Sequence, residues 1–98
     1  MELELGQLAK LNDIASRYYD IFADMDNRHE YINARVKLTK ILNAKVKVDL
    51  TLSELRVLQD ILDVELTVND GHKNLDTIEA KILYKEVSNA ISAEQRRG

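Results

Sequence analysis

The chain has 98 residues, of which 45% are hydrophobic and 32% charged, a composition typical of a folded domain and not of a disordered segment. Cysteine is absent, which excludes a disulfide framework, a thiolate metal site and a cysteine nucleophile. No apolar run approaches the roughly 20 residues that a membrane-spanning helix needs. Because proline is absent and only three glycines occur, long helices are favoured, and we expect one helical domain over residues 1–98.

An apolar pattern that extends from Leu8 to about Leu42 is expected to organise the fold. Its side chains recur every three or four residues, as on one face of a helix, and no glycine or proline interrupts them. This apolar row consists of Leu8, Leu11, Ala15, Tyr18, Phe22, Met25, His29, Ile32, Val36 and Thr39. Ile14, Ile21 and Leu42 widen it, and the greater width is typical of a helix that packs in a bundle.

The same stretch contains a second helix-start pattern. Asn27-Arg-His-Glu30 has the spacing of an N-cap residue followed by a capping-box glutamate, which would divide the stretch into two helices near residue 26. The apolar row nevertheless keeps its phase across this point. The pattern therefore favours one long helix, straight or bent, over residues 8–42, and leaves two helices as the alternative.

Residues 45–52 alternate between polar and apolar side chains, a pattern that predicts a short strand. Thr51-Leu-Ser-Glu54 then has the form of a capping box and predicts a helix from about residue 52 to residue 63. Val64, Leu66 and Val68 alternate again, so the pattern leaves open whether this helix continues.

A turn is predicted at Asn69-Asp-Gly-His72, and Asn74 or Asp76 can cap the helix that follows. The apolar face of that last helix comprises Leu75, Ile78, Ile82, Leu83, Val87, Ala90 and Ile91. Together these patterns predict an all-α fold. We expect a long N-terminal helix plus a helical hairpin, arranged like a bundle or coiled coil, with at most one short strand near 45–51.

Charge is distributed unevenly along the chain, although the net charge is only −3. Residues 1–30 carry seven acids and three bases, residues 31–48 carry five bases and no acid, and residues 49–98 carry ten acids and six bases. The five bases are Arg35, Lys37, Lys40, Lys45 and Lys47. They are expected either to neutralise acids of the fold or of a partner subunit, or to contact a polyanion or an acidic protein surface.

The length of the apolar row predicts self-association. The two later helices are too short to cover all of it, and antiparallel pairing with a second copy would also set acidic segments against basic ones. A homodimer is therefore expected, with an interface that includes Leu11, Tyr18, Phe22, Met25, His29 and Ile32. Tyr19 and Tyr31 lie outside the main row and are further interface candidates, because amphipathic rings suit protein contacts.

The sequence offers little for catalysis or metal binding. His29 and His72 lack a converging set of further ligands, and Asp20 and Asp24 fit a solvated helix face better than a cation site. No serine–histidine–acid set, phosphate-binding loop or dinucleotide fingerprint occurs. We therefore expect no enzyme, no cofactor and no metal site.

Residues 45–62, KVKVDLTLSELRVLQDIL, resemble the strand and first helix of the ribbon–helix–helix DNA-binding proteins. The resemblance covers about 45 residues if the 74–91 helix is the second helix of that motif. It implies that paired strands would enter the major groove, with Lys45, Lys47 and Asp49 directed outward.

These patterns predict a small non-enzymatic helical module for oligomerisation and protein binding, such as a regulator or an inhibitor of the kind carried by phages and mobile elements. Its expected partners are a second copy and an unidentified protein, and not a membrane. The acidic start of the chain is not typical of a signal peptide, so a cytoplasmic protein is expected. A ribbon–helix–helix-like DNA-binding regulator and an acidic nucleic-acid mimic are the alternatives.

Overall fold

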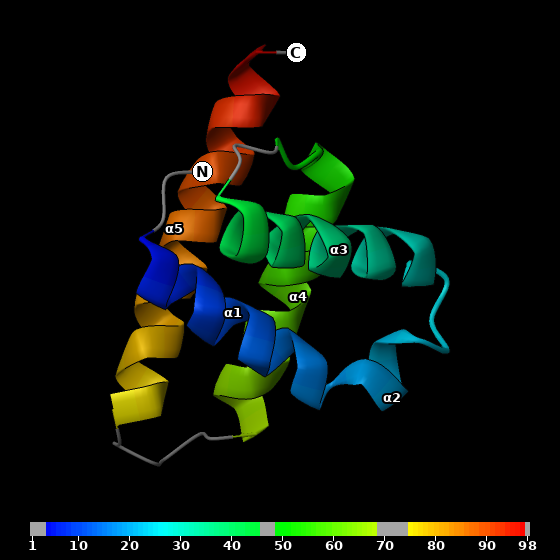
Figure 1. The fold of residues 1–98 in the computed structure, drawn as a ribbon, viewed down its shortest axis with the longest axis vertical. Helices are drawn as coiled ribbons and strands as arrows, with labels where there is room; N and C mark the ends of the chain where they lie inside the picture. The colour runs from blue at the N-terminus through cyan, green and yellow to red at the C-terminus, as the bar shows by residue number, and fades with distance from the viewer. Residues whose placement is uncertain (1–3, 46–48, 69–74, 98) are drawn as a thin grey trace.

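The computed structural model describes residues 4–45, 49–68 and 75–97, and 87% of these residues are helical. Five helices follow one another along the described parts of the chain, which contain no strand (Figure 1). The helices are α1 (Leu5–Arg17), α2 (Tyr19–Phe22), α3 (Arg28–Ala44), α4 (Leu52–Val68) and α5 (Leu75–Arg97). The all-α fold that the sequence predicts is confirmed.

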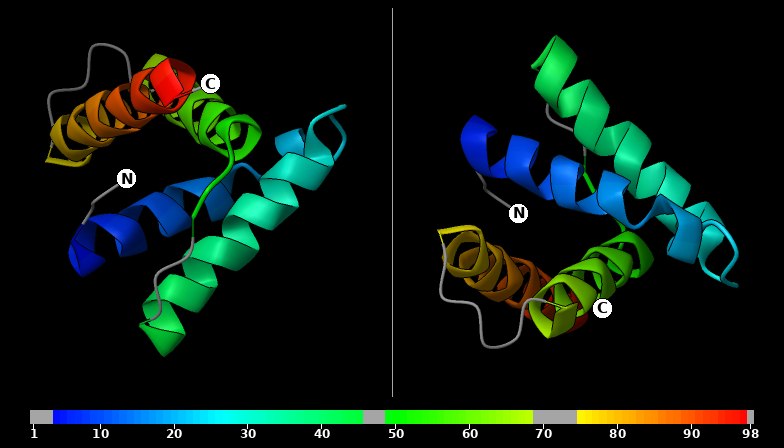
Figure 2. Two further views of the ribbon diagram at one scale, coloured as in Figure 1. Left: turned by 90° about the horizontal axis from the view of Figure 1, so that it is seen from above. Right: turned by 90° about the horizontal axis from the view of Figure 1, so that it is seen from below.

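The helices form two layers that cross each other. α4 and α5 run antiparallel as a hairpin, as predicted, and α1 and α3 lie across them (Figure 1). Views from above and below separate the α4–α5 pair from the pair formed by α1 and α3 (Figure 2). α4 contacts α1, α3 and α5, and α1 contacts α3, α4 and α5, so these two helices join the two layers.

The prediction of a single long helix over residues 8–42 is wrong. α1 ends at Arg17, α2 follows, and residues 23–27 turn the chain so that α3 runs back alongside α1 (Figure 1). The backbone of Tyr18 leaves helical geometry, with φ −105° and ψ 21°. α3 begins where the alternative placed it, after Asn27, although the Asn27 side chain makes no capping hydrogen bond.

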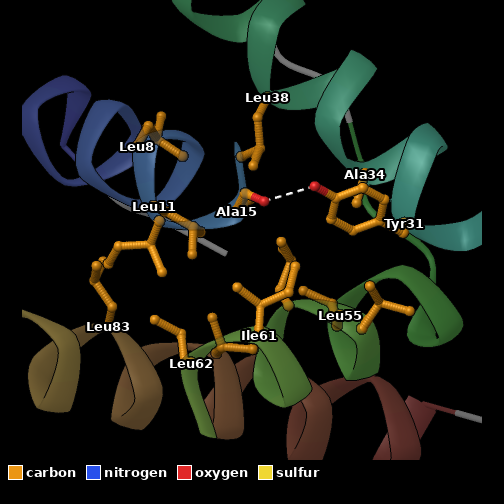
Figure 3. Close-up of a cluster of buried hydrophobic side chains, with 14 of the residues drawn as sticks. Leu8, Leu11, Ala15, Tyr31, Ala34, Leu38, Leu55, Ile61, Leu62 and Leu83 are labelled. Atoms are coloured by element: carbon orange, nitrogen blue, oxygen red, sulfur yellow. Dashed lines mark hydrogen bonds between the residues drawn. The ribbon is translucent and has the colours of Figure 1, made fainter. Parts of the chain in front are cut away.

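The core explains why the chain folds back. The close-up in Figure 3 shows side chains of α1, α4 and α5 meeting Tyr31, Ala34 and Leu38, which lie on α3 outside the apolar row. All three are fully buried. Burying a large apolar side chain contributes about 1.5–3 kcal/mol relative to leaving it exposed. The turn adds this second set of side chains to the core, and the free energy gained by burying them exceeds that of the helical hydrogen bonds lost at the turn.

The predicted capping box at the start of α4 is confirmed. The Thr51 N–H donates to Glu54 Oε1 at 2.8 Å, and the Glu54 N–H donates to Thr51 Oγ1 at 3.2 Å. α4 then continues to Val68, beyond the predicted end near residue 63. None of the described helices is long and apolar enough to cross a membrane.

Only part of the predicted strand near 45–51 lies in the described residues. Lys45 ends α3 in a left-handed conformation, with φ 54°, and residues 49–51 lead into α4 without strand geometry. Residues 46–48 lie outside the described residues, as do the predicted turn at 69–72 and the predicted cap at Asn74. The described residues therefore contain no strand of the kind that the ribbon–helix–helix resemblance implies.

Candidate protein-binding surface

The turn at residues 23–27 divides the apolar row into two parts with opposite surroundings. Four members before the turn are at most 6% exposed, namely Leu8, Leu11, Ala15 and Phe22. The five members of the second part are exposed, namely Met25 within the turn and His29, Ile32, Val36 and Thr39 on α3. Three of these five are apolar and 45–46% exposed, namely Met25, Ile32 and Val36. The second part of the row therefore gives α3 an open apolar face.

Tyr31 fixes which face of α3 meets the core. Its buried ring stacks on the ring of Phe22, with centroids 5.5 Å apart and planes inclined by 15°. Its hydroxyl donates to the carbonyl oxygen of Ala15 at 2.6 Å (Figure 3). Burial raises the pKa of this hydroxyl, which keeps it protonated as a donor. Because Tyr31 faces inward, Ile32 and Val36 lie on the outer side of the helix.

An open groove of about 350 Å³ borders this outer side between α2 and α3. Its lining residues are Tyr19, Tyr31, Ile32, Arg35, Val36 and Thr39. Tyr19 is 51% exposed, and its ring centroid lies 6.3 Å from that of Tyr31. A half-exposed aromatic ring beside two branched aliphatic side chains is typical of a protein contact site. We name Tyr19, Ile32 and Val36, together with this groove, the α2–α3 surface.

One wall of the groove carries a guanidinium group. The Arg35 guanidinium carbon lies 6.0 Å from the centroid of the Tyr31 ring, within the range of a cation–π contact. The Arg35 Nε atom is buried and has no hydrogen-bond partner. Because this atom is buried, a binding partner in the groove would meet Arg35 through the exposed part of its side chain.

The six predicted interface residues do not form one surface. Leu11 and Phe22 lie in the core of the chain itself, at 0% and 1% exposed. Tyr18 is partly buried, and its hydroxyl donates to Glu65. Met25 in the turn and His29 and Ile32 on α3 are exposed, and of these three only Ile32 lines the groove. Tyr19 and Tyr31, which the sequence singled out apart from the row, both line it.

The five predicted polyanion-contact bases are also separated. Lys37 Nζ donates to Glu54 Oε1 at 2.7 Å and to the carbonyl oxygen of Asp49 at 2.9 Å, so this base neutralises an acid of the fold. Lys40 and Lys45 are exposed, Arg35 packs on Tyr31, and Lys47 lies outside the described residues.

Glu54 is 3% exposed and joins the start of α4 to α3. Burial alone would raise the pKa of this carboxyl. The hydrogen bonds from Lys37 and Thr51 outweigh burial and hold the pKa of Glu54 below its ordinary value. The bond to Lys37 therefore fixes α3 to α4 on the side opposite the groove.

A second buried acid, Glu65, was not identified from the sequence. It is 2% exposed, and its carboxylate accepts hydrogen bonds from Arg17 at 3.2 Å and from the Tyr18 hydroxyl at 2.5 Å. Burial and the bond to Glu65 raise the pKa of Tyr18 to about 12. The sequence does contain a signal for a buried acid at this position. Glu65 lies seven and three residues after Leu58 and Leu62, so it shares the buried face of α4 with them.

A second exposed apolar site lies between α1 and α5. Ile78 and Ile82, predicted to lie on the buried face of the last helix, are 54% and 48% exposed. A groove of about 240 Å³ beside Ile82 is lined in part by Lys10 and Glu79, which form an ion pair at 3.9 Å. This site supplies a matched control for the α2–α3 surface.

Among the described residues, no group of three or more histidine and acidic side chains could hold a metal ion.

No protein-family model matches the chain, and no curated protein or solved structure is significantly similar to it. The function is therefore inferred from the chemistry of the surface alone.

Proposed function

We propose that the chain is a small non-enzymatic module that binds protein through the α2–α3 surface. The observation that supports this is the exposure of Tyr19, Ile32 and Val36 around one groove, in a fold that buries Tyr31, the neighbour of Ile32 in sequence. Covering apolar area contributes roughly 25 cal/mol per Å², so a partner that fills the groove gains from each of the three side chains. A role as a regulator or an inhibitor stays a prediction.

The charges near this surface favour protein over nucleic acid as the partner. Lys37, one of the five bases between residues 31 and 48, is held by Glu54 and by the Asp49 carbonyl. The groove itself offers two apolar aliphatic side chains and one guanidinium. Phosphate binding would leave the aliphatic side chains uncovered, whereas protein contacts combine apolar anchors with a few polar groups.

Site-specific photo-crosslinking in cells tests this function. A photoreactive phenylalanine analogue replaces Ile32 in one variant and Ile82, on the second apolar site, in the control variant. We expect protein adducts at position 32 and few or none at position 82, because only the first position borders the proposed contact. The absence of adducts at position 32, or equal yields at both positions, would contradict the function.

A further inference from the structure

Two exposed segments on either side of the turn carry opposite charge and similar apolar side chains. On α3, the cations Arg28 and Arg35 lie four and three residues from Ile32, and Lys40 lies four residues from Val36, so all three lie beside the exposed aliphatic pair. These five residues are called the basic face.

The complementary segment precedes the turn and continues into it. Ile21 and Met25 are 49% and 45% exposed, and they alternate with the exposed acids Asp20 and Asp24. These four residues are called the acidic segment. Each of the two regions thus presents a pair of aliphatic or thioether side chains, one pair among carboxylates and the other among cations.

Neither region has its charges paired within the described parts of the chain. Among the described residues, Arg28 and Lys40 form no ion pair within 4 Å, and the same holds for Asp20 and Asp24. Lys37, on the other side of α3, is by contrast paired within the chain, because its Nζ atom lies 2.7 Å from Glu54 Oε1. Arg28 and Lys40 therefore lie on α3 near the α2–α3 surface without an ion-pair partner among the described residues, while Arg35 lines its groove.

We propose that the partner of the α2–α3 surface is a second copy of this chain, whose acidic segment lies on the basic face. The inference rests on the proposed function, since it names the occupant of the same surface. Every copy carries both regions, so a two-fold arrangement forms the contact twice, with apolar pairs covered and opposite charges facing each other. A nucleic acid fits less well, because Asp20 and Asp24 would repel phosphate beside the basic face.

Charge complementation tests the pairing in the full chain. One variant carries Asp20→Lys and Asp24→Lys, and the other carries Arg28→Glu and Lys40→Glu; all four positions are exposed, so both variants should fold. We expect the wild type to sediment at twice its 11.2 kDa mass at high micromolar concentration. Each variant alone should remain at the single mass, and an equimolar mixture should recover the double mass, with dissociation promoted by salt.

A control with Lys81→Glu and Lys85→Glu, on the exposed side of α5, makes the same change in net charge as the variant with Arg28→Glu and Lys40→Glu and should sediment like the wild type. A monomeric wild type would overturn the second-copy inference, as would variants that still dimerise alone or a mixture that stays monomeric. Assemblies that grow beyond a dimer would contradict the two-fold arrangement. Adducts at position 32 in a chain that stays monomeric would leave the proposed function standing and refute only the second copy.

Discussion

The two parts of the apolar row, residues 8–22 and residues 25–39, have the same spacing, although the second part includes the polar residues His29 and Thr39. The first part lies mainly in the core, and the second lies on the surface. The difference arises at the turn between α2 and α3, where Tyr31 takes the inward position and its hydroxyl bonds to the Ala15 carbonyl. The periodicity of the sequence therefore defines the apolar face of a helix, whereas the turn determines whether that face packs in the core or is exposed to solvent.

The largest expected difference between the two parts is in stability. Phe22→Ala removes a fully buried ring from the core and should lower the free energy of unfolding by about 3–5 kcal/mol. Met25→Ala replaces the next member of the row, which is 45% exposed. It should change the free energy of unfolding of the monomer by less than about 0.5 kcal/mol. Urea denaturation at low protein concentration measures both. Equal losses would mean that the row is not divided between Phe22 and Met25.

Tyr31→Phe should have an intermediate effect. The change keeps the ring stacked on Phe22 but removes the donor to the buried Ala15 carbonyl, so we expect a loss of about 1–3 kcal/mol. Tyr19→Phe is the matched control, because Tyr19 is half exposed and no hydrogen bond from its hydroxyl to another described residue is seen. Thermal unfolding of the two variants compares them, and a larger loss for Tyr19→Phe would contradict the anchoring role of Tyr31.

A smaller effect on stability is expected from a change of pH at the Lys37–Glu54 contact. This contact joins α3 to α4 on the side of α3 opposite the groove. The pKa of Glu54 is lower in the folded chain than its ordinary value of 4.5, so the folded state favours the carboxylate. This contribution to stability is complete above pH 4.5 and is lost as the pH falls through the folded pKa.

Glu54→Gln is the variant that isolates this contribution. Its unfolding free energy should be below that of the wild type at pH 7, and the gap should narrow as the pH falls below 4.5. Urea titrations of both proteins at pH 7 and pH 3.5 provide the measurement. A gap that stays constant or widens in acid would show that the Lys37–Glu54 pair contributes no pH-dependent stability.

Local signals in the sequence predicted much of the helical fold. The capping box at Thr51 marked the start of α4, and the spacing of Leu83, Val87 and Ile91 placed α5. The low glycine content and the absence of proline favoured helices throughout. These signals act within a few residues of one another, which is why they can be recognised without the structure.

The break in the long helix could not be predicted in the same way. The N-cap pattern at Asn27 gave the boundary only as an alternative, because the row kept its phase and suggested continuity. The deciding contacts join residues distant in sequence: Tyr31 with Ala15, and Tyr18 with Glu65. The same limit applies to the candidate site, since Ile32 was predicted as an interface residue but its grouping with Tyr19 depends on the turn.

The division of the apolar row is tested most directly by thiol labelling, which the absence of cysteine in the natural chain makes unambiguous. Val36→Cys and Ala34→Cys place a single thiol on opposite faces of α3, one half exposed and the other fully buried. At nanomolar concentration, where self-association is negligible, the thiol at position 36 should react at least about 100-fold faster than the thiol at position 34. A faster reaction at position 34 would show that the row faces the core along its whole length and would contradict the division.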